Sequence, residues 1–182
     1  GFSIGSGNDS NENNKTYVAW CWKAGNGTVE NSDGTIQSTV SANRDAGFSI
    51  VSYDGIKAGA GSDTVGHGLD NAPTFIIVKN LRTTHSWSVY HDQNGTGAGT
   101  DKQLHIDTAT QTGQDSWTDF GVAPDSSVFT VQYSSRVNIV GEFIAYCWHG
   151  VEGFSQFGQY TGNGNADGPF IYMGFKPAFL IS

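Results

Sequence analysis

Charged residues are scarce in this sequence. Asp, Glu, Lys and Arg make up 14% of its 182 residues, well below the roughly 25% that is usual for a soluble domain. Only 9 residues are Lys or Arg, against 17 Asp or Glu, and the net charge is −8. Because contacts to phosphate groups need a basic patch, this balance argues against a nucleic-acid-binding protein and against binding to anionic membranes.

Long apolar runs and cysteines are also few. The longest apolar run is far shorter than the roughly 20 residues that a membrane-spanning helix needs, so we expect no membrane insertion. Nothing at the start of the sequence resembles a signal peptide. Two cysteines are too few for a disulfide framework.

Aromatic and glycine residues, by contrast, are plentiful. Aromatic residues reach 13% of the chain, and 25 residues are glycine. This many aromatic side chains can bury enough apolar surface for a folded core, so the composition is not that of a disordered chain. Short apolar runs separated by Gly, Asn, Ser, Thr and Asp favour an all-β protein with many turns.

Alternating apolar and polar residues, with β-branched and aromatic enrichment, predict the individual strands. No segment shows a helical period with capping residues. The closely spaced strands and the turn signals between them predict an antiparallel β-sandwich or jelly roll. The predicted strands lie near residues 15–23, 35–40, 47–53, 73–80, 86–91, 102–107, 127–133, 141–149, 154–160, 168–173 and 177–182.

One unusual hexamer occurs twice: "YVAWCW" at residues 17–22 and "FIAYCW" at residues 143–148. Such repeats set the architecture of a chain, and the similarity extends beyond the hexamer. Three more pairs match in the same order. Upstream, "FSIGSGNDSNENN" (residues 2–14) matches "FTVQYSSRVNIVG" (129–141). Downstream, "GFSIVSYDG" (47–55) matches "GFSQFGQYTG" (153–162), and "APTFIIV" (72–78) matches "KPAFLIS" (176–182). The first copy carries the extra residues 27–46 before its "GFS".

The spacing of these matches corresponds to a whole domain and not to a solenoid turn. We therefore expect residues 1–24 to be the C-terminal strands of one repeat and residues 25–152 to be a complete β-sandwich repeat. Residues 153–182 would be the N-terminal strands of the next repeat. On this interpretation the sequence is a window onto a longer tandem array.

The alternation of the hexamer predicts where its strand lies. Tyr17, Ala19 and Cys21 face one way, and the two tryptophans face the other. Both faces are apolar, so the strand should be central in its sheet. The small Ala and Cys side chains would let a second layer approach closely. In this interpretation each cysteine is a small buried core residue.

Several stretches together resemble a known family: "YVAWCWKAG", "GFSIVSYDG", "TVGHGLDNAPTFIIVKN", "WSVYH" and "SSVFTV…FIAYCWHGVEGFSQFGQYTGNG…GPFIYMGFKPAFLIS". They are similar to a tandem β-domain of tailed-bacteriophage virion proteins, common in tail fibres and appendages of marine phages and cyanophages. The resemblance implies a β-sandwich similar to concanavalin-A-like lectins and glucanases. The family has no agreed catalytic residues, so the resemblance implies a location in the virion more than a chemistry.

The first functional hypothesis is a non-enzymatic structural component of a phage virion, in a tail fibre, appendage or surface decoration, that contributes to host adhesion. Its partners would be other virion proteins. Phage fibres are commonly trimers, so we expect a homo-oligomer. The second hypothesis is a lectin-like module that binds host surface glycans. The third is a polysaccharide depolymerase, although the sequence has no E-x-D-x-x-E strand signature and few glutamates.

Candidate ligand contacts are aromatic residues that could stack on sugar rings. Trp117, in the polar stretch "DSWTDFG", is the first candidate, followed by Trp87 and Tyr133. The pattern "GFSIG" around Ser3 matches a nucleophile elbow but lacks the strand–turn–helix context. "NGNADG", from Asn163, lacks the acid that closes a calcium loop. No histidine pair has metal-site spacing, so we predict no catalytic residue, metal or cofactor.

Overall fold

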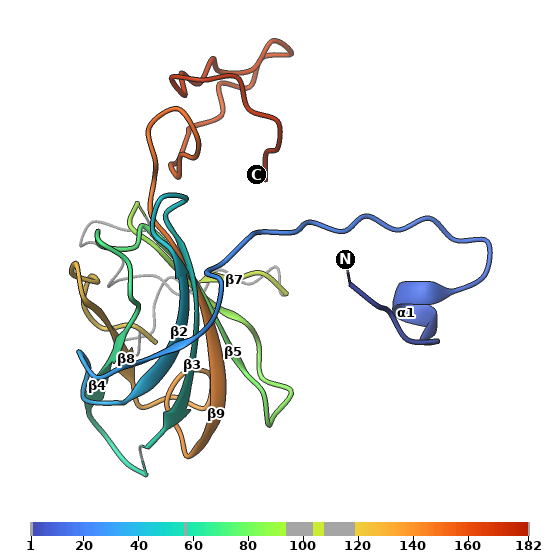
Figure 1. Cartoon of the computed structure of the whole chain (residues 1–182). Coiled ribbons are helices and arrows are strands. Elements are labelled where there is room, and N and C mark those ends of the chain that lie inside the picture. The colour runs from blue at the N-terminus through green and yellow to red at the C-terminus, as the bar shows by residue number, and fades with distance from the viewer. Residues whose placement is uncertain (1, 57, 94–103, 108–118, 182) are drawn as a thin grey trace.

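The computed structural model describes residues 2–56, 58–93, 104–107 and 119–181. Figure 1 shows a β-sandwich from which the two terminal segments extend. One short helix and nine strands are found in the described part of the chain: α1 (Asn8–Asn11), β1 (Val29–Asn31), β2 (Ser38–Asn43), β3 (Phe48–Gly55), β4 (Ser62–Gly66), β5 (Phe75–Asn80), β6 (Ser88–His91), β7 (Leu104–His105), β8 (Val128–Gln132) and β9 (Gly141–Trp148).

The strands form two sheets. The larger has seven strands in the order β1-β2-β3-β9-β5-β6-β7, and the smaller pairs β4 with β8. All these strand pairs are antiparallel. The prediction of an all-β antiparallel sandwich is therefore confirmed. The order is not sequential, because β9 lies between β3 and β5 although it comes last in the chain.

Strand β9 carries the second copy of the repeated hexamer, and it is central as the alternation predicts. For the first copy the prediction is wrong: residues 17–22 form no strand, and Cys21 is exposed because no second layer covers it. Its eight residues pair with all of β3 on one side, and six of them pair with β5 on the other. Phe143, Ala145 and Cys147 point inward and are fully buried. The small Ala145 and Cys147 side chains leave room for the second layer.

The core lies between the two sheets. Tyr53 of β3 stacks on Phe143 with ring centroids 5.3 Å apart, and the ring of Phe129 from β8 meets Tyr53 edge-on at 6.1 Å. Burying one such side chain contributes about 1.5–3 kcal/mol. Sixteen buried residues form this cluster: Ile36, Val40, Val51, Tyr53, Val65, Leu69, Ile76, Val78, Tyr90, Phe120, Phe129, Val131, Val137, Phe143, Ala145 and Cys147.

Buried polar groups tie the segment before β9 to the core. The Tyr53 hydroxyl donates a hydrogen bond to the Val137 carbonyl oxygen at 2.7 Å, and burial raises the pKa of Tyr53 well above its usual value. The Asn138 amide nitrogen donates to the Asp63 carboxylate at 2.9 Å. The Asn138 side-chain oxygen accepts the Ile56 N–H at 3.1 Å. These bonds satisfy groups that would otherwise be costly to bury.

His67 is fully buried directly after β4. Its Nδ1 accepts the Leu69 N–H at 3.1 Å, which leaves Nε2 to donate to the Asp125 carbonyl oxygen, also at 3.1 Å. Burial lowers the pKa of His67 because it penalises the imidazolium form. The Asp125 carboxylate itself accepts the N–H groups of Val128 and Ser127, which lower the pKa of Asp125.

We predict that the free energy of unfolding falls as the pH drops below about 6.5, the pKa of histidine in an unfolded chain. The unfolded chain then takes up a proton that folded His67 resists, so the loss continues down to the folded pKa. Burial lowers the pKa of His91 as well, and both contribute in the same direction. Urea unfolding at pH 8, 6.5 and 5.5 measures the effect.

His67→Gln is the variant that tests this assignment, since its amide can accept the Leu69 N–H and donate to the Asp125 oxygen. It should remove part of the decrease in the free energy of unfolding that occurs below pH 6.5, whereas His91→Gln should remove the remainder of that decrease. An unchanged slope in both variants would contradict the assignment to these two histidines.

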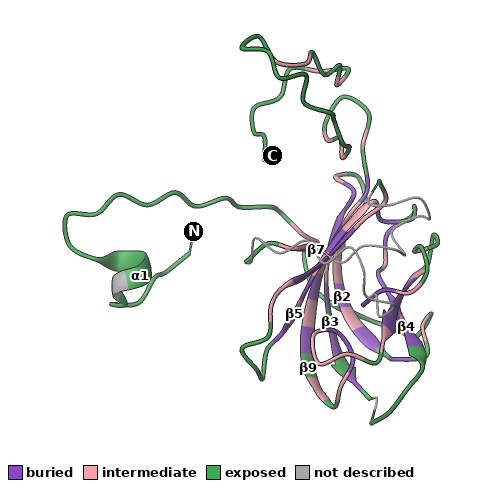
Figure 2. Cartoon of the chain, turned by 180° about the vertical axis from the view of Figure 1, so that it is seen from behind, coloured by how far each residue is buried: buried purple, intermediate pink, exposed green. Residues whose placement is uncertain are grey.

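The four strands expected at the ends of the chain are not formed. No strand lies in described residues 2–27 or 152–181, so the predictions at 15–23, 154–160, 168–173 and 177–182 are wrong for this structure. The physical reason is pairing, because a strand needs a neighbour for its N–H and C=O groups, whatever its side chains prefer. Figure 2 shows that both segments are largely exposed.

The remaining strands agree with the predictions to within a few residues. Two short strands, β1 and β4, were not predicted, because their polar sequences "VEN" and "SDTVG" show little apolar alternation. The short helix α1 was not predicted either. In the described part of the chain, no helix has the length and apolar character needed to cross a membrane. The assignment of residues 25–152 as one complete repeat stays a prediction, and strands β1 to β9 all lie within it.

Candidate functional site

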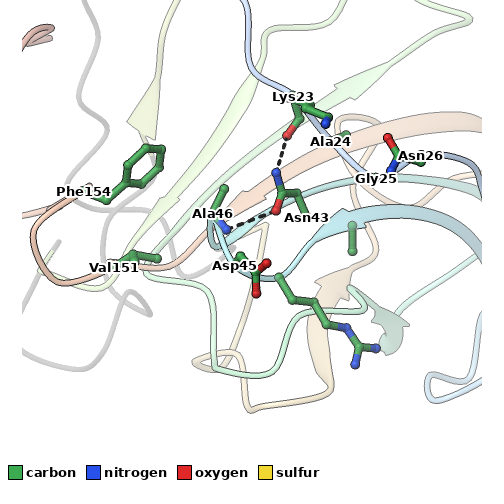
Figure 3. A pocket seen from close by; sticks show the side chains of 11 residues that line it. Lys23, Ala24, Gly25, Asn26, Asn43, Asp45, Ala46, Val151 and Phe154 are labelled. Carbon is green, nitrogen blue, oxygen red and sulfur yellow. Dashed lines mark hydrogen bonds between the residues drawn. The ribbon is translucent and has the colours of Figure 1, made fainter.

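An open pocket lies where both terminal segments join the sandwich (Figure 3). Its volume is about 820 Å³, within the range of small-ligand sites. We call it the junction pocket. Three parts of the chain line it: the residues leading into β1, the β2–β3 turn, and the residues after β9. Its lining residues are Lys23, Ala24, Gly25, Asn26, Ala42, Asn43, Arg44, Asp45, Ala46, Val151 and Phe154.

Asn43 holds the walls of the junction pocket together. Its amide nitrogen donates to the Lys23 carbonyl oxygen at 3.2 Å, and its amide oxygen accepts the Ala46 N–H at 3.2 Å. Gly25 permits the close approach of these segments, because a Cβ there would lie 2.7 Å from the Ala42 carbonyl oxygen. The N-terminal segment is thereby fixed against β2 by backbone contacts.

The pocket is suited to hydrogen bonding and stacking. Phe154 exposes 62% of its surface at one rim, and Asn26, Asn43 and Lys23 supply amide and ammonium groups. Asp45 is the one carboxylate among the described residues of the lining. A glycosidase mechanism uses two carboxylates flanking the bond, so these lining residues do not supply that pair.

A second feature is a row of aromatic rings on the face of the large sheet that points away from the core. Phe48, Trp148 and Phe75 are cross-strand neighbours on β3, β9 and β5. The centroid of the Trp148 ring lies 5.0 Å from that of Phe48 and 5.5 Å from that of Phe75. We call these three residues the aromatic row. Trp22 and Phe157 from the terminal segments contact it, with centroids 6.0 Å from Trp148 and 5.6 Å from Phe75.

Trp87, a predicted glycan contact, is half-buried directly before β6. The Lys79 ammonium lies 5.8 Å from the centroid of its indole ring. Lys79 sits between the buried residues Val78 and Asn80 of β5, so it points away from the core. Trp87 therefore lies on the outer face of the large sheet, where its ring supports a cation–π contact.

The other two predicted contacts do not join Trp87 in a common platform that the structure describes. Tyr133 directly follows β8 in the small sheet, the layer on the opposite side of the core from the outer face that carries Trp87. It is 42% exposed, and its N–H donates to the Gly61 carbonyl oxygen at 2.9 Å. Trp117 lies outside the described residues. Trp87, Tyr133 and Trp117 stay predictions as ligand contacts.

A family model for a domain of unknown function (DUF7483) matches residues 1–182. The chain belongs to the DUF7483 family. The match includes both terminal segments as well as the sandwich, so the junction pocket lies wholly within the family's span. No curated protein and no solved structure matches the chain.

In this DUF7483 domain the described residues around the candidate chemical motifs form turns and loops and not a catalytic or metal site. Among the residues that the structure describes, no group of three or more His, Cys, Asp and Glu could hold a metal ion. Asn163 accepts the Asn165 N–H at 3.0 Å in a tight turn, as expected for the "NGNADG" stretch. The short helix α1 follows Ser3, but no strand precedes it within the described residues, so the elbow geometry is absent there.

Sequence reasoning missed the residues of the junction pocket. Phe154 was interpreted as part of a strand, and Asn43 and Asp45 belong to the extra residues 27–46, to which no function was assigned. The available signal was the turn sequence "ANRDAG" beside the junctions expected near residues 25 and 152. Only the fold brings those separate stretches together in one hollow.

Proposed function

We propose that this DUF7483 domain is a non-enzymatic structural module of a tailed-bacteriophage virion protein, in a tail fibre, appendage or surface decoration. The observation that carries the proposal is the role of the repeated hexamer. Ala145 and Cys147 are fully buried and Trp148 belongs to the aromatic row, and these are the three positions identical in both copies. In the sandwich the hexamer thus serves as a packing unit and not as a binding motif, and we expect the same role for the first copy once its strand has neighbours.

The module acts mechanically and by multivalency. Each sandwich is a stable spacer, and several copies bring weak contacts to the same host surface. Linked weak contacts produce an avidity well above the affinity of any single one. Other virion proteins and further copies of the chain are the partners that this role requires.

Immunogold electron microscopy tests the virion location. Antibodies raised against the purified chain should label intact particles of a phage whose genome encodes it, at the tail or on the surface. Antibody preabsorbed with the chain is the control and should leave particles unlabelled. Absence of the chain from purified particles, measured by mass spectrometry, would refute the proposal.

Glycan binding by the junction pocket is a second candidate function. The observation that favours it is a pocket lining that combines the exposed ring of Phe154 at one end with the amides of Asn43 and Asn26 farther along. Aromatic rings stack on the apolar faces of sugars, and amide groups bond to hydroxyls, so this combination fits a saccharide. The net charge of −8 favours a neutral sugar over an acidic one.

Binding of host surface polysaccharide to the immobilised chain tests this second function. Phe154→Ala should weaken binding at least tenfold because it removes the stacking surface. Phe170→Ala is the matched control: it changes a Phe that is 91% exposed in the same C-terminal segment but lies outside the pocket. Equal binding by both variants would exclude the pocket, and release of reducing sugar would contradict a non-enzymatic role.

A further inference from the structure

The terminal segments leave large apolar side chains in solvent. The N-terminal segment comprises residues 2–24 and the C-terminal segment residues 153–181. Neither contains a strand in the described structure. Apolar groups left in water at this density indicate a surface that is covered by a partner. The exposed apolar residues are Phe2, Ile4, Tyr17, Val18, Trp20, Trp22, Phe154, Tyr160, Phe170, Ile171, Tyr172, Phe179, Leu180 and Ile181.

The internal repeat assigns these segments to particular strands. Residues 17–22 match the last six residues of β9, residues 153–160 match the start of β3, and residues 176–181 match the start of β5. In the sandwich, β9 lies between β3 and β5. The N-terminal segment thus carries a central strand, and the C-terminal segment carries its two neighbours.

Local structure supports the correspondence. Gly47, directly before β3, has a φ of +62°, and its equivalent Gly153 has a φ of +73°, a conformation that favours glycine. The Trp148–Phe75 ring pair, with centroids 5.5 Å apart, corresponds to Trp22 and Phe179. The centroids of those two rings lie 5.9 Å apart. The equivalent aromatic pair is therefore already in contact before any strand has formed.

We propose that residues 17–22 of one copy form a strand between residues 154–160 and residues 178–181 of a second copy. The register follows from β9. Cys147 lies opposite Ser49 of β3 and Ile76 of β5, so Cys21 lies opposite Ser155 and Leu180. This addition of a strand satisfies backbone groups. It packs Trp20 and Trp22 beside Phe179 on one face of the sheet and places Cys21 with Leu180 on the other.

The partner is a second copy and not the same chain. Within one chain the two segments meet through ring contacts of Phe179 with Trp20 and Trp22, yet no strand forms there. Those side chains remain 43–61% exposed. The described terminal residues of each copy carry one such central strand and one such pair of neighbours, so this contact is head-to-tail and extends into a chain of copies. The inference rests on the repeat and the sheet order, independently of any virion location.

Disulfide trapping of the full chain tests the register. Leu180→Cys and Ser155→Cys each place a thiol opposite Cys21, which is exposed. Cys147 is fully buried, and burial raises the pKa of its thiol, so it does not react in the folded protein. Mild copper-catalysed oxidation should convert most of each variant into disulfide-linked dimers and longer ladders on a non-reducing gel.

Two neighbouring variants are the matched controls. Ile181→Cys and Gln156→Cys correspond to Ile77 and Ile50, which lie opposite Tyr146 on the other face of the sheet. Like the test variants, each control has two exposed thiols, Cys21 and the introduced cysteine. In the controls the introduced thiol does not point toward Cys21. They should form ladders at least fivefold more slowly than Leu180→Cys and Ser155→Cys. The near-ultraviolet circular dichroism of all four should match that of the wild type.

Three outcomes overturn the proposal. Equal cross-linking in all four variants would show unspecific contact between exposed segments. A cross-linked monomer, which migrates faster than the reduced chain, would show that each chain pairs its own segments. No cross-linking in Leu180→Cys or Ser155→Cys would show that the segments do not pair.

Discussion

Phe143→Ala should lower the free energy of unfolding by about 3–5 kcal/mol. Phe143 is fully buried on the central strand β9, and its ring stacks on Tyr53 at an interplanar angle of 12°. Removing the ring leaves a cavity between two sheets whose eight-residue β3–β9 pairing resists collapse. Because whole domains are stable by about 5–15 kcal/mol, the variant should lie near the limit of folding.

Urea unfolding followed by tryptophan fluorescence measures this loss. Phe170→Ala makes the same chemical change at a side chain that is 91% exposed, and it should cost less than about 0.5 kcal/mol. A loss below about 1 kcal/mol in Phe143→Ala would show that Phe143 is not the centre of the core.

Arg136→Met should also destabilise the sandwich by about 3–5 kcal/mol, because it leaves a buried carboxylate without its cation. The Asp119 side chain is 1% exposed. Arg136 binds it through Nε at 2.9 Å and Nη2 at 3.1 Å. The Ser88 hydroxyl of β6 donates a hydrogen bond to the same carboxylate. This cluster links the large sheet to the segments that flank β8.

The companion variants separate charge from packing. Arg136→Lys keeps the positive charge but loses the two-pronged geometry, so its loss should be intermediate. Adding Asp119→Asn to Arg136→Met removes the buried charge and should recover part of the stability. Urea unfolding measures all of these losses. If the loss of the double variant equals the sum of the losses of the two single variants, the ion pair is not the cause of the destabilisation.

The local pattern of apolar and polar residues was sufficient to predict a strand wherever that strand has its neighbours in the same chain. The runs around β3, β5 and β9 alternate or are continuously apolar, and the observed boundaries lie within two residues of the predicted ones. Pattern failed for β4, a mostly polar strand that exists because it pairs with β8 over five residues. It failed in the opposite direction at residues 17–22, where strand propensity is high but no strand of the described structure pairs with them.

The candidate site was less predictable than the fold. Aromatic residues can be found in a sequence, but whether a ring is a core residue or a contact depends on which face it occupies. Trp148 proved to be part of a packed row, whereas Phe154 forms an exposed rim. The junction pocket joins stretches more than a hundred residues apart, so local sequence has no information about it.

The sequence by itself determined which side chains of β9 point inward, because residues of a strand alternate between its faces. It also determined the all-β class and the recurrence of the hexamer. Only the tertiary structure decided that β9 lies between β3 and β5, and that the aromatic row forms across all three. The reason is that cross-strand hydrogen bonds and ring contacts join residues distant in the chain, and their energy depends on a register that no single segment specifies.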